Sequence, residues 1–101
     1  MAAGEPDAGI HVLVNGRVQG VGFRDFVKQR ADRAGVAGWV RNLRDGRVEA
    51  VLKGSPDAMQ AVLEDIGRGP PAARVEEVVT RPALAQEGAL AKAPLEVRRN
   101  A

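Results

Sequence analysis

Ten residues near the start of the chain carry the clearest chemical signal in the sequence. They run Asn15-Gly-Arg-Val-Gln-Gly-Val-Gly-Phe-Arg24 and include three glycines, at positions 16, 20 and 22. Glycine lets the backbone turn sharply and leaves its N–H groups open to a ligand. Successive N–H groups that point inward bind anions, and the N-terminus of a following helix adds a positive dipole end. The run therefore predicts a phosphate-binding turn between a strand and a helix.

Arg24 strengthens this prediction through its charge and its position. It falls in the first turn of the predicted helix, where a cation opposes the helix dipole unless an anion is present. Its planar guanidinium can hold two phosphate oxygens at once. The run is not a nucleotide-binding loop, because Asp25 stands where the dinucleotide fingerprint has its third glycine and no Gly-Lys-Ser/Thr is present. A tight turn without a ligand remains the alternative reading of the glycines alone.

The elements around this turn are predicted in the order strand, helix, strand, strand, helix, strand. Strands are expected at 10–14, 36–43, 47–53 and 75–80, with a short edge strand at 95–98. Helices are expected at 23–34 and from Pro56 to Gly67, the second with Ser55 as its N-cap. Asp45-Gly46 predicts a hairpin turn, and Gly67 is expected to close the second helix. The fold class is therefore α+β, a ferredoxin-like βαββαβ sandwich. Its antiparallel-dominated sheet would carry two helices on one face and an additional C-terminal edge strand.

Length and composition narrow the class of protein further. The 101 residues are expected to form one domain at 10–99, with a flexible tail at 1–9 and a loop at 82–94. The absence of cysteine excludes disulfides, thiolate metal sites and a cysteine nucleophile, and favours a cytoplasmic location. No apolar run approaches the roughly 18 residues of a membrane span. The net charge of +2 is spread along the chain, which does not indicate a nucleic-acid partner.

The predicted topology brings a second polar residue, Asn42, to the same edge of the sheet as the glycine turn. A right-handed crossover makes the first two strands parallel, with the third antiparallel between them. Strands lie about 4.8 Å apart, so the turn and Asn42 are expected about 10 Å apart. A tetrahedral anion and one water molecule would fit between them.

Two motifs in the chain resemble the acylphosphatase family. Residues 16–24 match its first signature, G-x-V-Q-G-V-x-F-R, at every fixed position. Residues 38–42 and 45–49 read Gly-Trp-Val-Arg-Asn and Asp-Gly-Arg-Val-Glu, similar to its second signature, G-W-V-x-N then G-x-V-E. The likeness covers residues 10–80 and implies the ferredoxin-like sandwich that the pattern of elements also predicts. Leu95 stands where the family often has an aromatic residue in its last strand.

The resemblance implies hydrolysis of the carboxylic–phosphoric anhydride of a small acyl phosphate. The catalytic residues would be Arg24 and Asn42, with Asn42 holding the attacking water. The phosphate would be bound by Gln19, Gly20, Val21, Gly22, Phe23 and Arg24. A carboxylate is a good leaving group, so no general acid, metal or cofactor is expected.

Two other functions remain open on the sequence alone. An RNA-binding module shares the βαββαβ order, but such modules stack bases on two or three aromatic residues, and the strands here contain only Trp39. The second alternative function is a regulatory domain that binds phosphate or acyl phosphate without hydrolysing it. The presence of both Arg24 and Asn42 argues against this alternative. His11 is expected to be partly exposed and structural, and Trp39 to pack under a helix. Nothing in the sequence calls for more than a monomer.

Overall fold

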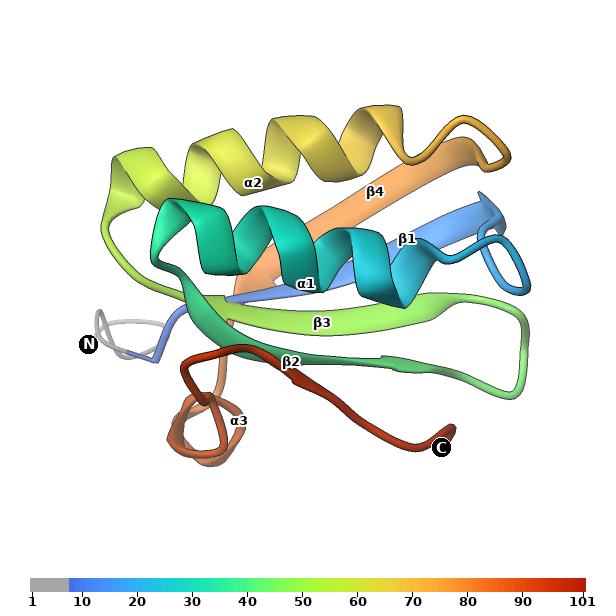
Figure 1. Ribbon diagram of the computed structural model, residues 1–101. Coiled ribbons are helices and arrows are strands. Elements are labelled where there is room, and N and C mark those ends of the chain that lie inside the picture. The colour runs from blue at the N-terminus through green and yellow to red at the C-terminus, as the bar shows by residue number, and fades with distance from the viewer. Residues whose placement is uncertain (1–7) are drawn as a thin grey trace.

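A computed structural model describes residues 8–101, in which a five-stranded sheet is combined with three helices (Figure 1). The strands are β1 (Ile10–Arg17), β2 (Ala37–Asn42), β3 (Val48–Lys53), β4 (Arg74–Pro82) and β5 (Glu96–Val97). The helices are α1 (Phe23–Ala34), α2 (Pro56–Arg68) and α3 (Ala85–Ala89). This order confirms the predicted ferredoxin-like α+β fold and its additional edge strand. No helix of residues 8–101 is long and apolar enough to cross a membrane.

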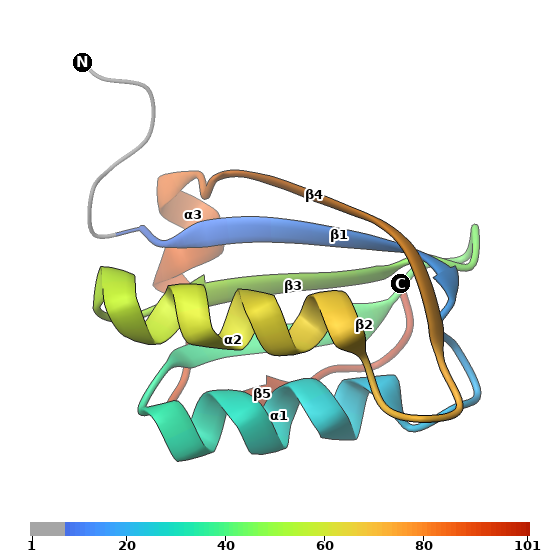
Figure 2. The same cartoon turned by 90° about the horizontal axis from the view of Figure 1, so that it is seen from above.

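The strand order places the end of β2 and the loop after β1 at one edge of the sheet. The order is β4-β1-β3-β2-β5, and β3 pairs antiparallel with both β1 and β2. β1 and β2 therefore run in the same direction on either side of β3, as predicted (Figure 2). β4 pairs antiparallel with β1, and β5 pairs in parallel with β2.

The main core lies between the sheet and the two long helices, which cover the same face (Figures 1 and 2). Val12 and Val14 of β1 face this core, as the alternation in the sequence predicts. From α1 the buried side chains are Phe23, Val27 and Ala31. Full burial of a side chain such as Phe23 stabilises the fold by about 1.5–3 kcal/mol. The first turn of α1, where Arg24 lies, is thereby fixed against the sheet.

Helix α2 begins as predicted and ends later than predicted. The Ser55 side chain caps it by accepting a hydrogen bond from the backbone N–H of Ala58 at 3.2 Å. The helix continues past Gly67 to Arg68 and is capped by Gly69, whose φ is +68°. The predicted end at Gly67 is wrong because Gly69 is the residue that takes the positive φ that closes the helix.

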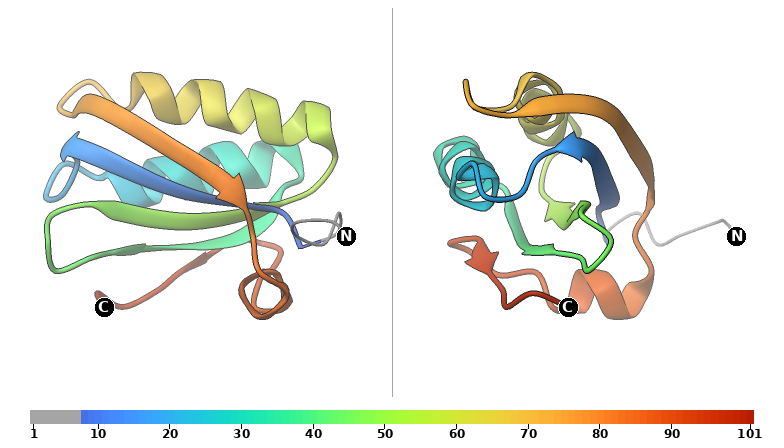
Figure 3. Two further views of the ribbon diagram at one scale, coloured as in Figure 1. Left: turned by 180° about the vertical axis from the view of Figure 1, so that it is seen from behind. Right: turned by 90° about the vertical axis from the view of Figure 1, so that its right-hand side faces the viewer.

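The opposite face of the sheet carries a smaller apolar cluster of Ala8, Trp39, Val51 and Ala83, with α3 beside it (Figure 3). Helix α3 lies inside the segment 82–94, which was expected to be a loop. Trp39 Nε1 donates a hydrogen bond to the backbone oxygen of Glu87 in α3 at 3.2 Å. Trp39 therefore packs against a helix, on the side of the sheet away from α1 and α2.

The folded part of the chain begins before residue 10. Ala8 is buried, and the backbone oxygen of Gly9 accepts a hydrogen bond from Ala83 N–H at 2.9 Å. These two residues were assigned to a flexible tail at 1–9, and that assignment is wrong for them because they pack against the start of the 83–89 segment. Residues 1–7 lie outside the described part of the chain.

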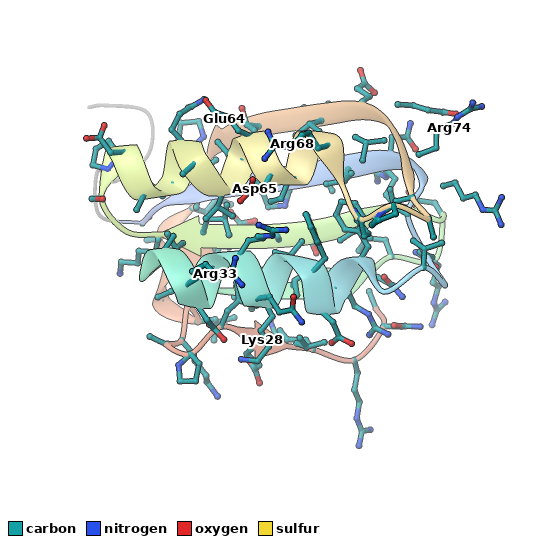
Figure 4. The ribbon with its side chains drawn as sticks, turned by 45° about the horizontal axis from the view of Figure 1, so that its top comes forward. Lys28, Arg33, Glu64, Asp65, Arg68 and Arg74 are labelled. Atoms are coloured by element: carbon teal, nitrogen blue, oxygen red, sulfur yellow. The ribbon has the colours of Figure 1, made fainter. Side chains whose placement is uncertain are left out.

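The segment that leads into β5 is fastened to α1. Lys28 Nζ donates to the backbone oxygen of Leu95 at 2.9 Å, and Asp32 Oδ1 accepts from Leu95 N–H at 2.8 Å. Figure 4 shows Lys28 on the side of α1 that faces this segment. Leu95 itself is buried, so it fills its place in the core although it is not aromatic. The chain after β5 is thereby directed along the edge of β2.

Candidate active site

The glycine loop between β1 and α1 leaves a series of backbone donors without partners. Gly20 and Gly22 both have left-handed backbone conformations, with φ of +74° and +77°. The first hydrogen bond at the start of α1 is donated by Phe26 N–H to the Gly22 oxygen at 3.0 Å, and no side chain caps the helix. Within the described residues, no hydrogen bond is donated by the backbone N–H groups of residues 20–25. Open donors at a helix N-terminus favour an anionic ligand.

The side chain of Gln19 fastens this loop to the turn that follows β2. Its Nε2 donates to the backbone oxygens of Leu43 and Arg47 at 2.7 and 2.9 Å. Leu43 directly follows Asn42, and its own N–H donates to the Arg47 oxygen at 2.8 Å. The glycine loop and the end of β2 are thus held together by hydrogen bonds in which Gln19 is the bridging side chain.

A pocket of about 120 Å³ opens between the loop, the start of α1 and the end of β2. Its lining residues are Val18, Gly20, Gly22, Phe23, Arg24, Asp25, Asn42 and Val97. This volume accommodates a phosphate group and a water molecule. Backbone donors, a guanidinium and an amide therefore surround one anion-sized space.

The pocket brings together most of the residues predicted from the sequence. Gly20, Gly22, Phe23, Arg24 and Asn42 line it. The other two predicted residues, Gln19 and Val21, do not line it: Gln19 turns toward the β2–β3 turn, and Val21 packs against the core. Val18, Asp25 and Val97 line the pocket and were not predicted. Only Asp25 had a signal in the sequence, its position next to Arg24, whereas Val97 comes from a strand far along the chain.

Arg24 is half-buried, and its guanidinium is held on one side only. Nη1 donates to the backbone oxygen of Arg98 at 3.3 Å and to Asn100 Oδ1 at 3.2 Å. Both acceptors are neutral, so they leave the positive charge of the side chain uncompensated. Among residues 8–101, Nε and Nη2 donate no hydrogen bond, and this edge of the guanidinium is available for a bidentate contact.

Asn42 is the last residue of β2 and is only 8% exposed. Its Oδ1 is buried and has no hydrogen-bond partner within the described residues. A buried acceptor without a partner costs about 1–3 kcal/mol, so such atoms are usually explained by a function or by a bound water. The Asn42 amide thus has hydrogen-bonding capacity that the fold does not use.

Two arginines near this edge of the sheet, Arg41 and Arg47, are paired with carboxylates outside the pocket. Arg47 pairs with Asp45 at 2.8 Å, and its hydrogen bonds hold the pKa of the Asp45 carboxyl below its usual value. Arg41 Nε donates to Glu49 Oε1 at 2.6 Å on the opposite face of the sheet. Neither Arg41 nor Arg47 lines the pocket. Their ion pairs stabilise the hairpin of β2 and β3 and lie outside the pocket.

His11 lies away from the pocket and is buried, which corrects the expectation that it is partly exposed. It is 3% exposed, and its Nε2 lies 2.8 Å from Glu49 Oε2. Burial alone would raise the pKa of Glu49, but the hydrogen bonds from His11 and Arg41 outweigh it and lower that pKa. Glu87 of α3 lies 4.0 Å from the same nitrogen, so His11 links the sheet to α3. These contacts lie outside the pocket, and the expectation of partial exposure is wrong because α3 covers this face of the sheet.

Comparison with known proteins places these features in a family. A family model of acylphosphatases matches residues 10–89. An acylphosphatase of Synechococcus sp. is 56% identical over 72 residues, covering 71% of this chain and 77% of that protein. An acylphosphatase of Rubrobacter xylanophilus is 52% identical over 80 residues, which cover 79% of this chain and 73% of that protein. A solved acylphosphatase structure from Coxiella burnetii has a TM-score of 0.78 at 37% identity, over 88% of this chain and 90% of that one. Likeness of this extent, in sequence and in fold, shows that the chain belongs to the acylphosphatase family.

Proposed function

We propose that this chain hydrolyses acyl phosphates, the reaction of its family, in the pocket between the glycine loop, Arg24 and Asn42. The observation that carries the proposal is that unpartnered loop N–H groups, the free edge of a guanidinium and an unused amide surround one pocket. Phosphoryl transfer requires positioning and charge stabilisation more than covalent chemistry by the protein. These three kinds of group supply both requirements.

Phosphate binding is the task of the 19–23 loop and Arg24. Backbone N–H groups of the loop and of the first turn of α1 donate to the phosphate oxygens, and Gln19 keeps the loop in place. The Nε and Nη2 edge of Arg24 adds two parallel charge-assisted hydrogen bonds. Together they stabilise the negative charge on the equatorial oxygens in the transition state.

Asn42 holds the water that attacks phosphorus. Its amide can donate to and accept from that water, but it cannot remove a proton. A phosphate oxygen of the substrate therefore takes the proton. The new P–O bond forms from water while the P–O bond to the acyl group breaks, and the carboxylate leaves with the bonding electron pair. Because a carboxylate leaves readily, the reaction is proposed to need neither a general acid nor a metal.

We propose further that the protein acts as a monomer in the cytoplasm. In this proposal Arg24 and Asn42 of the same chain act together, since both line one pocket. A sequence without cysteine suits a reducing compartment. The oligomeric state is checked by light scattering at the concentration of the activity assay, where a dimer mass would contradict this part of the proposal.

Release of phosphate from benzoyl phosphate tests the proposed function. We expect the wild-type protein to turn over this substrate and both Arg24→Ala and Asn42→Ala to lose at least about 100-fold in kcat/KM. Arg33→Ala is the matched control for the arginine, because Arg33 is exposed on the last turn of the same helix, away from the pocket (Figure 4). Equal rates for the wild type and the two pocket variants would refute the proposal and leave a phosphate binder.

A further inference from the structure

The last four residues, 98–101, form a strap along the end of β2; we call them the C-terminal strap. Arg98 N–H donates to the Val40 oxygen at 2.8 Å, and Ala101 N–H donates to the Asn42 oxygen at 2.9 Å. These bonds follow the parallel pairing of β5 with β2, which ends at Val97, and Figure 3 shows the C-terminal segment continuing from β5. The strap is therefore fastened to the strand that ends in Asn42, a residue that lines the pocket.

The same strap contacts the other proposed catalytic residue. Arg24 Nη1 donates to the Arg98 oxygen and to Asn100 Oδ1, at 3.3 and 3.2 Å. Nη1 carries two of the five guanidinium N–H groups, so these two acceptors match its donors in number. The three donors on Nε and Nη2 are left for the phosphate. Asn100 is exposed, and no other hydrogen bond of its side chain is present within residues 8–101.

We infer that Asn100 is a positioning residue for Arg24, which it holds by Nη1 so that the Nε and Nη2 edge faces the phosphate. The inference deepens the proposed function and rests on it. A long side chain that is free in the unbound protein loses rotamer freedom when it binds a ligand, which weakens binding. An arginine held beforehand by neutral acceptors avoids that loss and keeps its full charge. The Asn100 amide does this without competing for the phosphate, since it touches only Nη1.

The Asn100→Ala variant of the full chain provides the first test. We expect the inhibition constant of inorganic phosphate and the KM for benzoyl phosphate to rise about three- to tenfold, the effect of freeing one rotamer-rich side chain. The melting temperature should stay unchanged, because Asn100 is exposed and packs against no core residue. Gln60→Ala, which removes an exposed amide from α2, is the control and should change none of these values. Tighter phosphate binding by Asn100→Ala would overturn the inference, because the strap would then be a competitor.

The Asn100→Asp variant adds a readout that a purely structural role would not move. The introduced carboxylate would lie beside Arg24 and repel the phosphate at neutral pH, so kcat/KM should fall below that of Asn100→Ala. The neighbouring guanidinium lowers the pKa of such a carboxyl, so the introduced charge persists across the pH range of the assay. A kcat/KM for Asn100→Asp equal to that of Asn100→Ala at neutral pH would overturn the inference, because it would separate residue 100 from the phosphate site.

Arg24→Ala distinguishes failure of this inference from failure of the proposed function. If Arg24→Ala loses phosphate affinity while Asn100→Ala keeps the wild-type constants, the proposed function stands and the role of Asn100 is overturned. If Arg24→Ala keeps the wild-type constants, both are overturned. In the double variant, Asn100→Ala should cause no additional loss, because a residue that acts through Arg24 has no effect once Arg24 is absent.

Discussion

Replacement of Gln19 by alanine tests whether this side chain anchors the glycine loop or binds the phosphate itself. Gln19 Nε2 donates to the Leu43 oxygen at 2.7 Å and to the Arg47 oxygen at 2.9 Å. Each hydrogen bond of this kind contributes about 1 kcal/mol net, so the free energy of unfolding should fall by about 2 kcal/mol. With an unfolding entropy of about 2.1 cal/mol/K per residue, a domain of this size should melt about 10 °C lower.

Loss of the anchor should also weaken phosphate binding. The loop then has to be ordered when the ligand binds, which should raise the dissociation constant of inorganic phosphate about three- to tenfold. The assay is thermal unfolding followed by circular dichroism, with and without inorganic phosphate, and Gln60→Ala on the surface of α2 is the matched control. A melting temperature within about 2 °C of wild type, together with a large loss of phosphate affinity, would refute the anchoring role. Gln19 would then contact the phosphate directly.

Three further predictions concern the guanidinium, a crowded glycine and an acidic residue of α3. Arg24→Lys keeps the charge but loses the planar fork, so kcat/KM for benzoyl phosphate should fall about 100-fold, and near-normal turnover would show that charge alone suffices. Gly38→Ala should lower the free energy of unfolding by about 3 kcal/mol or prevent folding, since a Cβ there would lie 2.0 Å from the Val51 oxygen. Gly67→Ala is its control in urea unfolding, because a Cβ at Gly67 meets nothing within 4 Å and alanine favours the helix. The hydrogen bond from Arg81 lowers the pKa of Glu87 to about 2 from its ordinary value of 4.5. Because the folded-state pKa is the lower one, this stabilisation is present above pH 4.5 and is lost as the pH falls toward 2. Glu87→Gln should therefore lower the free energy of unfolding by about 1–2 kcal/mol at neutral pH, after allowance for solvent screening. The free energy of unfolding should then fall less steeply in the variant as the pH drops below 4.5. The same pH dependence in Glu87→Gln as in Glu64→Gln, an exposed control on α2, would contradict this.

The sequence was sufficient to predict that Arg24 and Asn42 share one edge of the sheet. That prediction needed only local signals and one general rule. Glycines mark the turn, apolar alternation marks the strands, and the right-handed crossover fixes which strand ends meet. Trp39 also packs against a helix, as predicted, and Gly38 beside it allows a close approach of β3.

Contacts between segments far apart in the chain could not be predicted in this way. The alternation of side chains along β1 places His11 on the face of the sheet away from the long helices. Nothing near His11 in the sequence shows that α3 covers that face. The contact between Arg24 and Asn100 joins residues 76 positions apart through a strap with no apolar pattern. Gln19 fits the phosphate-loop motif equally well as a ligand or as an anchor, and only the positions of Leu43 and Arg47 show where its amide points.

The division of roles between Arg24 and Asn42 is tested most directly by the kcat of Asn42→Ala with saturating benzoyl phosphate. The side chain is expected to hold the attacking water and to leave phosphate binding to the loop and Arg24. We therefore predict that kcat falls by about 100-fold or more, because the water is no longer positioned, while the inhibition constant of inorganic phosphate changes less than about twofold. A kcat within about twofold of wild type would contradict the account, because the attack would then not depend on Asn42.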